Sequence, residues 1–194
     1  MSRSNPYKKK RRQTKSTVLI YGEGLTEEIF LKHLKQVYSK AGNIAVTIRK
    51  GRGGSVDNPV VNASRYLGDF DRRFVVIDDD RPRQEIMKAE KKAARQNITI
   101  FKNTPCIEAT MLSILNNGKR YSQKSTSWCK KEFELSHVSQ NKRGGLEERL
   151  ECKKIFPKKL LDEQRKRNKI LNGLILTMTK IKNANSVFPV SIKT

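Results

Sequence analysis

Acidic side chains occur at two places where the sequence also predicts the end of a β-strand. Glu23 lies in a glycine-flanked turn directly after the β-prone run 17–21. Asp78 and Asp80 directly follow the apolar run 74–77, and because side chains alternate along a strand, we expect both carboxylates to point to the same side. Active sites of parallel sheets lie at the carboxyl ends of the strands, so the three acids are expected to lie together there.

A site built from these carboxylates favours a hard divalent cation. Two carboxylates about 4 Å apart repel each other by roughly 4 kcal/mol at an effective dielectric constant near 20, and a bound divalent cation removes that repulsion. No His or Cys lies nearby in the sequence, and oxygen ligands alone favour Mg²⁺ or Mn²⁺ over zinc. We therefore predict that Glu23, Asp78 and Asp80 are metal ligands and catalytic residues.

The same acids also allow purely structural interpretations. Asp80 precedes Arg81-Pro82 and could simply cap the helix that follows. Glu27 and Glu28 lie at the start of a predicted helix, where they could merely complement the helix dipole. These alternatives need no metal site, and they stay open at the level of the sequence.

Strand-like and helix-like segments alternate through residues 16–118. The strand-like segments are short and apolar, which is typical of strands buried on both faces. This alternation predicts an α/β fold with a mainly parallel sheet and helices on both faces. Strands are expected at 17–21, 44–48, 73–77 and 98–101, and helices at 26–40, 58–66, 83–96 and 106–115.

The last third of the chain is less regular and more basic. Residues 119–157 mix polar residues and glycines with short amphipathic pieces, and 160–182 predicts one helix with an apolar face. We therefore expect three parts: a disordered basic arm over 1–15, a catalytic domain over 16–118 and a basic, mainly helical extension over 119–194.

The charge of the chain indicates a polyanionic partner. The chain has 42 Lys and Arg residues against 19 Asp and Glu residues, a formal net charge of +23, which favours nucleic acid as the partner. A basic run near the N-terminus is expected to lie along phosphates, although a solubilising tail or a nuclear import signal has the same composition. The basic loop over 49–55 either binds phosphate or is an ordinary turn. The residues predicted to contact nucleic acid are Lys8, Lys9, Lys10, Arg11, Arg12, Arg49, Lys50, Arg52, Arg81, Arg165, Lys166 and Arg167.

Several classes of protein are excluded by what the sequence lacks. No apolar stretch approaches the roughly 20 residues of a membrane span, so we expect a soluble, cytoplasmic protein. Three cysteines without CxxC spacing and two histidines leave a structural zinc site without ligands. The sequence has no nucleotide-binding P-loop and no obvious triad for Ser or Cys hydrolysis.

Three sequence elements, in this order, resemble a known family. They are the acidic turn Glu23-Gly24-Leu25-Thr26-Glu27, the pair Asp78-x-Asp80 and the helix start Pro105-Cys106-Ile107-Glu108. Over residues 16–118 the chain is similar to the Toprim-type domain of RloB-like proteins. The resemblance implies a role in prokaryotic antiviral defence, often beside an ABC-type ATPase. It also implies a Toprim-like fold with a Mg²⁺ site for phosphodiester chemistry, held by Glu23, Asp78 and Asp80, with Glu27 and Glu108 as further ligands.

These observations together favour a Mg²⁺-dependent or Mn²⁺-dependent endonuclease acting on DNA or RNA. In that mechanism Asp78 and Asp80 hold the metal, and Glu23 is either a further ligand or the general base. The alternative is a non-catalytic nucleic-acid- or ribosome-binding protein, which the net charge alone would suit. A third hypothesis is a regulated subunit that an ATPase holds inactive.

Overall fold

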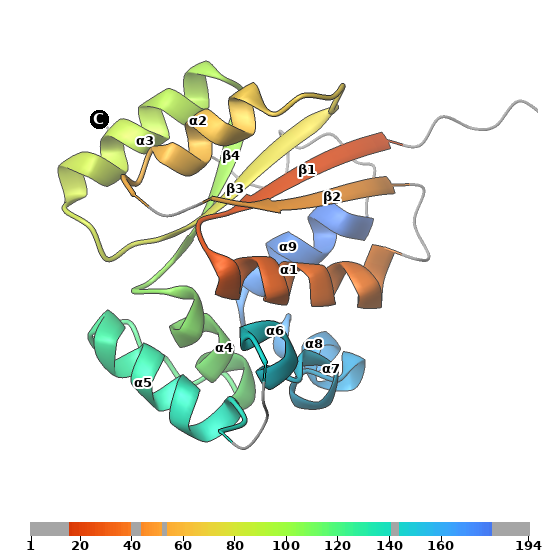
Figure 1. Cartoon of the computed structure of the whole chain (residues 1–194), viewed down its shortest axis with the longest axis vertical. Coiled ribbons are helices and arrows are strands. Elements are labelled where there is room, and N and C mark those ends of the chain that lie inside the picture. Colours follow the sequence, from red (N-terminus) through yellow and green to blue (C-terminus); the bar gives the residue numbers. More distant parts are fainter. Residues whose placement is uncertain (1–15, 40–43, 52–53, 141–143, 180–194) are drawn as a thin grey trace, which may run out of the picture.

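The part of the chain that the structure describes is built around one sheet of four parallel strands (Figure 1). The structure is a computed structural model that describes residues 16–39, 44–51, 54–140 and 144–179. The strand order is β2-β1-β3-β4, and the predicted α/β class with a parallel sheet is confirmed. The strands are β1 (Ser16–Gly22), β2 (Ile44–Lys50), β3 (Arg72–Asp78) and β4 (Ile98–Asn103).

Helices cover both faces of this sheet, as the sequence predicts. α1 (Leu25–Tyr38) and α9 (Lys169–Thr179) lie on one face, and α2 (Asn58–Arg65) and α3 (Arg83–Arg95) lie on the other (Figure 1). Each of the first three strands is followed by a helix and then by a parallel strand, which is the connection typical of such sheets. The turns that leave β1 and β3 therefore meet at the same edge of the sheet.

The two faces of β1 explain why its sequence is apolar throughout. Val18 and Ile20 belong to the hydrophobic cluster that includes α1, whereas Leu19 and Tyr21 belong to the cluster under α2 and α3. A strand that is covered on both faces needs apolar side chains at every position rather than at every second one. This double cover holds the end of β1, and the turn after it, in a fixed place.

The helices after β4 pack on α1 or on one another and share one hydrophobic core with α1. No helix among the described residues is long and apolar enough to span a membrane. The C-terminal region contributes to the same hydrophobic cluster as α1, so its position relative to the sheet is fixed by packing. These helices are α4 (Ile107–Leu115), α5 (Thr126–His137), α6 (Leu146–Arg149), α7 (Cys152–Ile155) and α8 (Lys158–Gln164).

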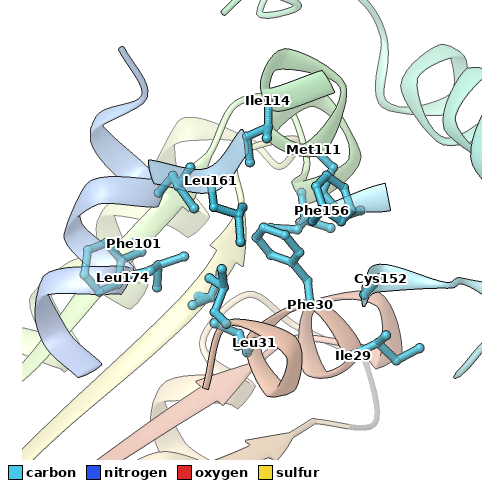
Figure 2. Packing of buried hydrophobic residues seen from close by; sticks show 14 of the residues in the cluster. Ile29, Phe30, Leu31, Phe101, Met111, Ile114, Cys152, Phe156, Leu161 and Leu174 are labelled. Carbon is cyan, nitrogen blue, oxygen red and sulfur yellow. The ribbon is translucent and has the colours of Figure 1, made fainter. Parts of the chain in front are cut away.

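Phe30 of α1 is a central residue of this shared core. Its ring meets that of Phe156 edge-on, with ring centroids 5.2 Å apart. Figure 2 shows Phe30 beside Phe156 and Leu161, and all three side chains are fully buried. Contacts between residues so distant in the sequence attach the C-terminal region to the helix that follows Glu23.

The predicted helix over 160–182 is wrong, because the chain forms two helices there. α8 ends at Gln164 and α9 starts at Lys169. Asn168 interrupts the helix: its Oδ1 accepts the backbone N–H of Leu171 at 3.0 Å, which is the bond of an N-cap residue. The expected basic arm over 1–15 and the tail after residue 179 lie outside the described residues.

Candidate active site

The turn between β1 and α1 holds Glu23 at the carboxyl end of the sheet. Gly51, directly after β2, donates its backbone N–H to the Gly22 carbonyl at 2.9 Å and so fixes the turn against the neighbouring strand. Gly22 has to be glycine because a Cβ atom there would lie 2.7 Å from the Cβ atom of Glu27. The glycine therefore lets the end of β1 pack closely on the first turn of α1.

Asp78 is the last residue of β3 and connects three elements. Its backbone N–H donates to Glu23 Oε2 at 3.3 Å, and its own Oδ1 accepts the backbone N–H of Ile107 at 2.9 Å. Ile107 is the first residue of α4, so the carboxylate lies at a helix N-terminus, where the helix dipole favours negative charge. Asp78 is only 7% exposed. The structure thus brings Glu23 and Asp78 together.

Two further acids, Glu27 and Glu108, are buried beside this pair. Glu27 Oε2 accepts the backbone N–H of Gly24 at 3.0 Å, so this side chain stabilises the start of α1. Glu108 lies in the first turn of α4, and its Oε2 is buried without a hydrogen-bond partner. A buried carboxylate oxygen without a partner is costly, and it indicates a site that a ligand completes.

Glu23, Glu27, Asp78 and Glu108 form what we call the acidic cluster. Burial, and then the charges of Glu27, Glu108 and Glu23, raise the pKa of Asp78 to about 8. Burial, and then repulsion by Glu108 and Glu23, raises the pKa of Glu27 to about 7. The four carboxylates are therefore close enough to repel one another, and positive charge at this place would relieve the repulsion.

Lys130 of α5 is a cation that faces the acidic cluster and that the sequence analysis missed. Its Nζ lies 3.9 Å from Asp78 Oδ2, and its side chain is 51% exposed. Although burial has the opposite effect, the charges of Glu108 and Asp78 raise the pKa of Lys130. No pattern in the sequence shows that α5 packs on α4, so no signal could place this lysine at the site.

Asp80 lies at the exposed rim of the site, next to Arg81. β3 ends at Asp78, so the alternation of side chains along the strand does not extend to Asp80. The carboxylate of Asp80 pairs with Arg81, with Oδ1 and Nε 3.8 Å apart. The capping interpretation of Asp80 is wrong, because Pro82 is the N-cap of α3 and no side chain caps that helix. The role of Asp80 as a metal ligand stays a prediction.

Arg49 and Lys50 lie at the same edge of the sheet as the acidic cluster. Lys50 is exposed, and it pairs in register with Gly22 of β1. Arg49 donates from Nε to the hydroxyl of Tyr66 at 2.6 Å, and its guanidinium lies over the same ring. Lys50 is thus better placed than Arg49 to contact a phosphate group. Arg52 and the basic run Lys8 to Arg12 lie outside the described residues.

The basic triplet Arg165, Lys166 and Arg167 lies in the turn between α8 and α9, away from the acidic cluster. Arg165 donates to Asn172 Oδ1 at 3.1 and 3.0 Å. Arg167 donates to Asn117 Oδ1 at 2.6 Å, just beyond the end of α4 that is opposite the cluster. The two arginines therefore hold parts of the fold together, and Lys166 is exposed.

A row of cations on α3 was not singled out by the sequence analysis. Lys88, Lys91 and Arg95 are exposed at the spacing that places residues on one face of a helix. The ion pairs of α3 among the described residues involve Lys92 and Glu90 instead. The aliphatic parts of the row line a hollow of about 500 Å³. We call Lys88, Lys91 and Arg95 the α3 row.

The chemistry of the acidic cluster fits a hard divalent cation, but its geometry is not that of a finished metal site. All four side chains are carboxylates, the ligands that Mg²⁺ and Mn²⁺ prefer, and Glu108 Oε2 has no other partner. Within the described ranges, no group of three or more His, Cys, Asp or Glu side chains is arranged to hold a metal ion. Small movements of the side chains are thus needed before the carboxylates could share one cation.

Comparison of the chain with protein-family models, with curated proteins and with solved structures finds no match. The similarity to the Toprim-type domain of RloB-like proteins therefore stays a prediction from three sequence elements. Two of these elements, the turn with Glu23 and the strand end with Asp78, lie in hydrogen-bond contact, and the third places Glu108 beside them. The function of the chain is therefore inferred from the geometry of the acidic cluster.

Proposed function

We propose that this chain is a nuclease that cleaves phosphodiester bonds with the help of Mg²⁺ or Mn²⁺. The acidic cluster carries the proposal. It buries Glu27, Asp78 and Glu108 together at the carboxyl end of a parallel sheet, where active sites of this architecture lie. Mutual repulsion of buried carboxylates lowers stability, so stability does not explain the cluster, whereas binding a cation does.

The cluster residues would divide the chemistry according to their positions. Asp78 and Glu108 would hold the cation, because both are buried and Glu108 Oε2 is without a partner. Glu23 is more exposed, so it would be a further ligand or accept the proton of the attacking water. Asp80, at the rim, would be an outer ligand. A bound Mg²⁺ or Mn²⁺ would polarise the phosphoryl oxygen and neutralise the departing oxyanion.

Cations around the cluster would position the nucleic acid. Lys130 is half-exposed beside Asp78 and can reach a phosphate that enters the site. Lys50 lies at the same edge of the sheet, and the α3 row lies farther along, starting five residues after Arg83, the first residue of α3. Contacts of this kind bind the backbone and carry no base information, so we expect little sequence preference.

The test is cleavage of labelled single-stranded and duplex DNA and RNA with Mg²⁺, with Mn²⁺ and with chelator. We expect cleavage with either cation, none in chelator, and a loss of cleavage in Asp78→Asn and Glu23→Gln. Glu28→Gln is the matched control, because Glu28 neighbours Glu27 on α1 but pairs with Lys32 at 3.3 Å. Cleavage by Asp78→Asn at the parent rate contradicts the proposal.

A non-catalytic nucleic-acid-binding protein is the second candidate. The contact between Lys130 and Asp78 favours it, because a lysine at 3.9 Å can neutralise part of the cluster without a metal. In that case Lys130→Gln should destabilise the chain, whereas under the nuclease proposal it should mainly slow cleavage. Thermal melts of this variant together with the cleavage assay separate the two candidates.

The similarity to RloB-like proteins adds a cellular context to the proposal. It supports a cytoplasmic antiviral effector that works with an ABC-type ATPase, and this part rests on the three sequence elements alone. Co-purification of the tagged chain with the products of adjacent genes tests it. An ATPase that binds the chain and changes its cleavage rate would support that context.

A further inference from the structure

A pair of aromatic rings, one exposed and one buried, lies beside the start of α5. Trp128 is the single tryptophan of the chain and is 38% exposed. Its ring stacks on that of Tyr121, with centroids 5.9 Å apart and ring planes inclined by 22°. Lys124 Nζ lies 5.0 Å from the centroid of the Trp128 ring, and Lys119 Nζ lies 5.8 Å from that of Tyr121. We call these four residues the aromatic platform.

The packing of α5 does not explain why Trp128 is exposed. Cys129 and Phe133 are the buried residues that fix α5 in the core. Tyr121 is only 8% exposed and its hydroxyl accepts a hydrogen bond from Asn116 Nδ2 at 2.9 Å, so this ring of the pair is held in place. The indole therefore rests on a rigid base while more than a third of the residue stays in contact with solvent.

We propose that the aromatic platform binds single-stranded nucleic acid by stacking a base on Trp128. Exposed aromatic rings beside cations are the combination that binds single strands without sequence preference. Residues 119–131 carry five Lys or Arg residues and no Asp or Glu. When a base stacks on the indole, the flexible side chain of Lys124 can leave the ring and contact the adjacent phosphate. This inference rests on the proposed function and names its substrate class.

The platform selects single strands because duplex bases are not available for stacking. In a duplex the faces of the bases are covered by their neighbours, and only phosphates and groove edges are accessible. The platform and the acidic cluster both involve α5, because this helix carries Trp128 and also Lys130, whose Nζ lies 3.9 Å from Asp78 Oδ2. A strand held on Trp128 would thus be bound by the helix that also carries a cation of the proposed cleavage site.

The first test uses Trp128 as its own probe. Emission of the single tryptophan is recorded in chelator, so that no cleavage occurs, while oligonucleotides of about ten nucleotides are added. The probes are oligo-dT, oligo-U and a duplex of the same length. We expect saturable quenching by both single strands and little change with the duplex. Unchanged emission at saturating single strand, or equal quenching by the duplex, would overturn the proposal.

The second test measures binding by anisotropy of a labelled single strand. We expect Trp128→Leu to weaken binding by roughly tenfold or more and Trp128→Phe, which keeps a ring, to weaken it less. Leu135→Ser is the matched control, because Leu135 is also on α5 and is 64% exposed, and this variant should bind like the parent. Lys124→Gln keeps the indole and should require several-fold more oligonucleotide for the same quenching.

The outcomes separate this inference from the proposed function. Parent-like affinity of a folded Trp128→Leu, checked by circular dichroism, overturns the platform even if the chain cleaves nucleic acid. Stacking in a chain that never cleaves overturns the nuclease proposal and leaves the platform. If Trp128→Leu does not fold, the fluorescence titrations of the parent and of Lys124→Gln still decide.

Discussion

The acidic cluster and the aromatic platform include residues of two neighbouring helices, Glu108 of α4 and Trp128 of α5, but they are built in opposite ways. Asp78 is buried, its backbone N–H donates to the Glu23 side chain, and its carboxylate accepts the backbone N–H of Ile107. Trp128 is exposed, and its cations are carried on flexible side chains. Three of the four acids, Glu23, Glu27 and Asp78, thus accept a main-chain N–H, whereas in the platform a hydrogen bond holds Tyr121 and the lysine side chains stay adaptable.

This difference matches what each region would have to do. Cleavage requires ligands held close to one geometry, because a small displacement of a reacting group costs much of the rate. Binding a phosphate backbone requires positive charge but little geometry, because phosphates recur along the strand. The comparison predicts that single changes in the cluster abolish activity, whereas single changes among the cations weaken binding gradually.

The largest expected effect separates the cluster from its rim. Asp78→Asn should lower the cleavage rate by more than about a hundredfold, since it removes a buried ligand from the transition state. Asp80→Asn should lower it by less than about tenfold, since this side chain is exposed and paired with Arg81. Both rates are measured with saturating Mg²⁺ and the same single strand.

Equal losses in the two variants would mean that Asp80 belongs to the site in the way the sequence predicts, and the distinction between cluster and rim would fail. Affinity in chelator is the control for both variants. It should stay close to that of the parent, because neither carboxylate attracts the nucleic acid.

A second effect is the dependence of stability on pH in chelator. The folded pKa of Glu27 is about 7, above its ordinary value of 4.5, so the native state binds a proton more tightly than the unfolded state does. Stability from this group is therefore complete below about pH 4.5 and is lost as the pH rises through about 7. Between pH 5 and pH 8 the free energy of unfolding of the parent should therefore fall by roughly 2 kcal/mol because of Glu27. Glu27→Gln should not show this fall.

Denaturant unfolding of parent and variant at several pH values measures this difference. Gln keeps an oxygen that can accept the N–H of Gly24, so the start of α1 is preserved. Glu28→Gln is the control for the loss of one carboxylate on α1 outside the acidic cluster. A Glu27→Gln variant with the same pH profile as the parent would show that burial and the neighbouring carboxylates do not raise the pKa of Glu27 in the native state.

The smallest expected effects concern the cations. Replacing Lys88, Lys91 and Arg95 of the α3 row with Gln should flatten the plot of log affinity against log salt by up to about 2 units, since each phosphate contact to a single strand contributes about 0.7. The control removes the same charge elsewhere, by replacing Lys153, Lys154 and Lys159 on α7 and α8 with Gln. Equal slopes for the two triple variants would show that only net charge matters.

The sheet and its helices could be predicted from the sequence because local patterns determine them. Four apolar runs gave the strands to within two residues, and Glu23 and Asp78 could be placed together because the ends of parallel strands share an edge. The role of Asp80 could not be derived in this way, since the alternation rule holds only while the chain remains a strand. The break at Asn168 was missed because the apolar periodicity continues on both sides of it.

Lys130 and Trp128 could not be placed from the sequence for a different reason. Both depend on how α5 packs on α4, which is decided by contacts such as the burial of Cys129 and Phe133 rather than by any local pattern. The sequence shows a lysine pair and one tryptophan in a region without clear periodicity. Only the tertiary structure shows that one of these lysines faces Asp78 and that the tryptophan rests on Tyr121.

The most direct test of the metal-binding account is a thermal melt of the parent and of Asp78→Asn at pH 8, with saturating Mg²⁺ and with chelator. Asn keeps an oxygen for the N–H of Ile107, so the variant removes charge and preserves the hydrogen bond. We predict that Mg²⁺ raises the melting temperature of the parent by about 5 °C or more. Asp78→Asn should melt in chelator at or above the parent and gain nothing from Mg²⁺. A parent without a Mg²⁺ shift, together with an Asp78→Asn variant destabilised in chelator, would contradict the account.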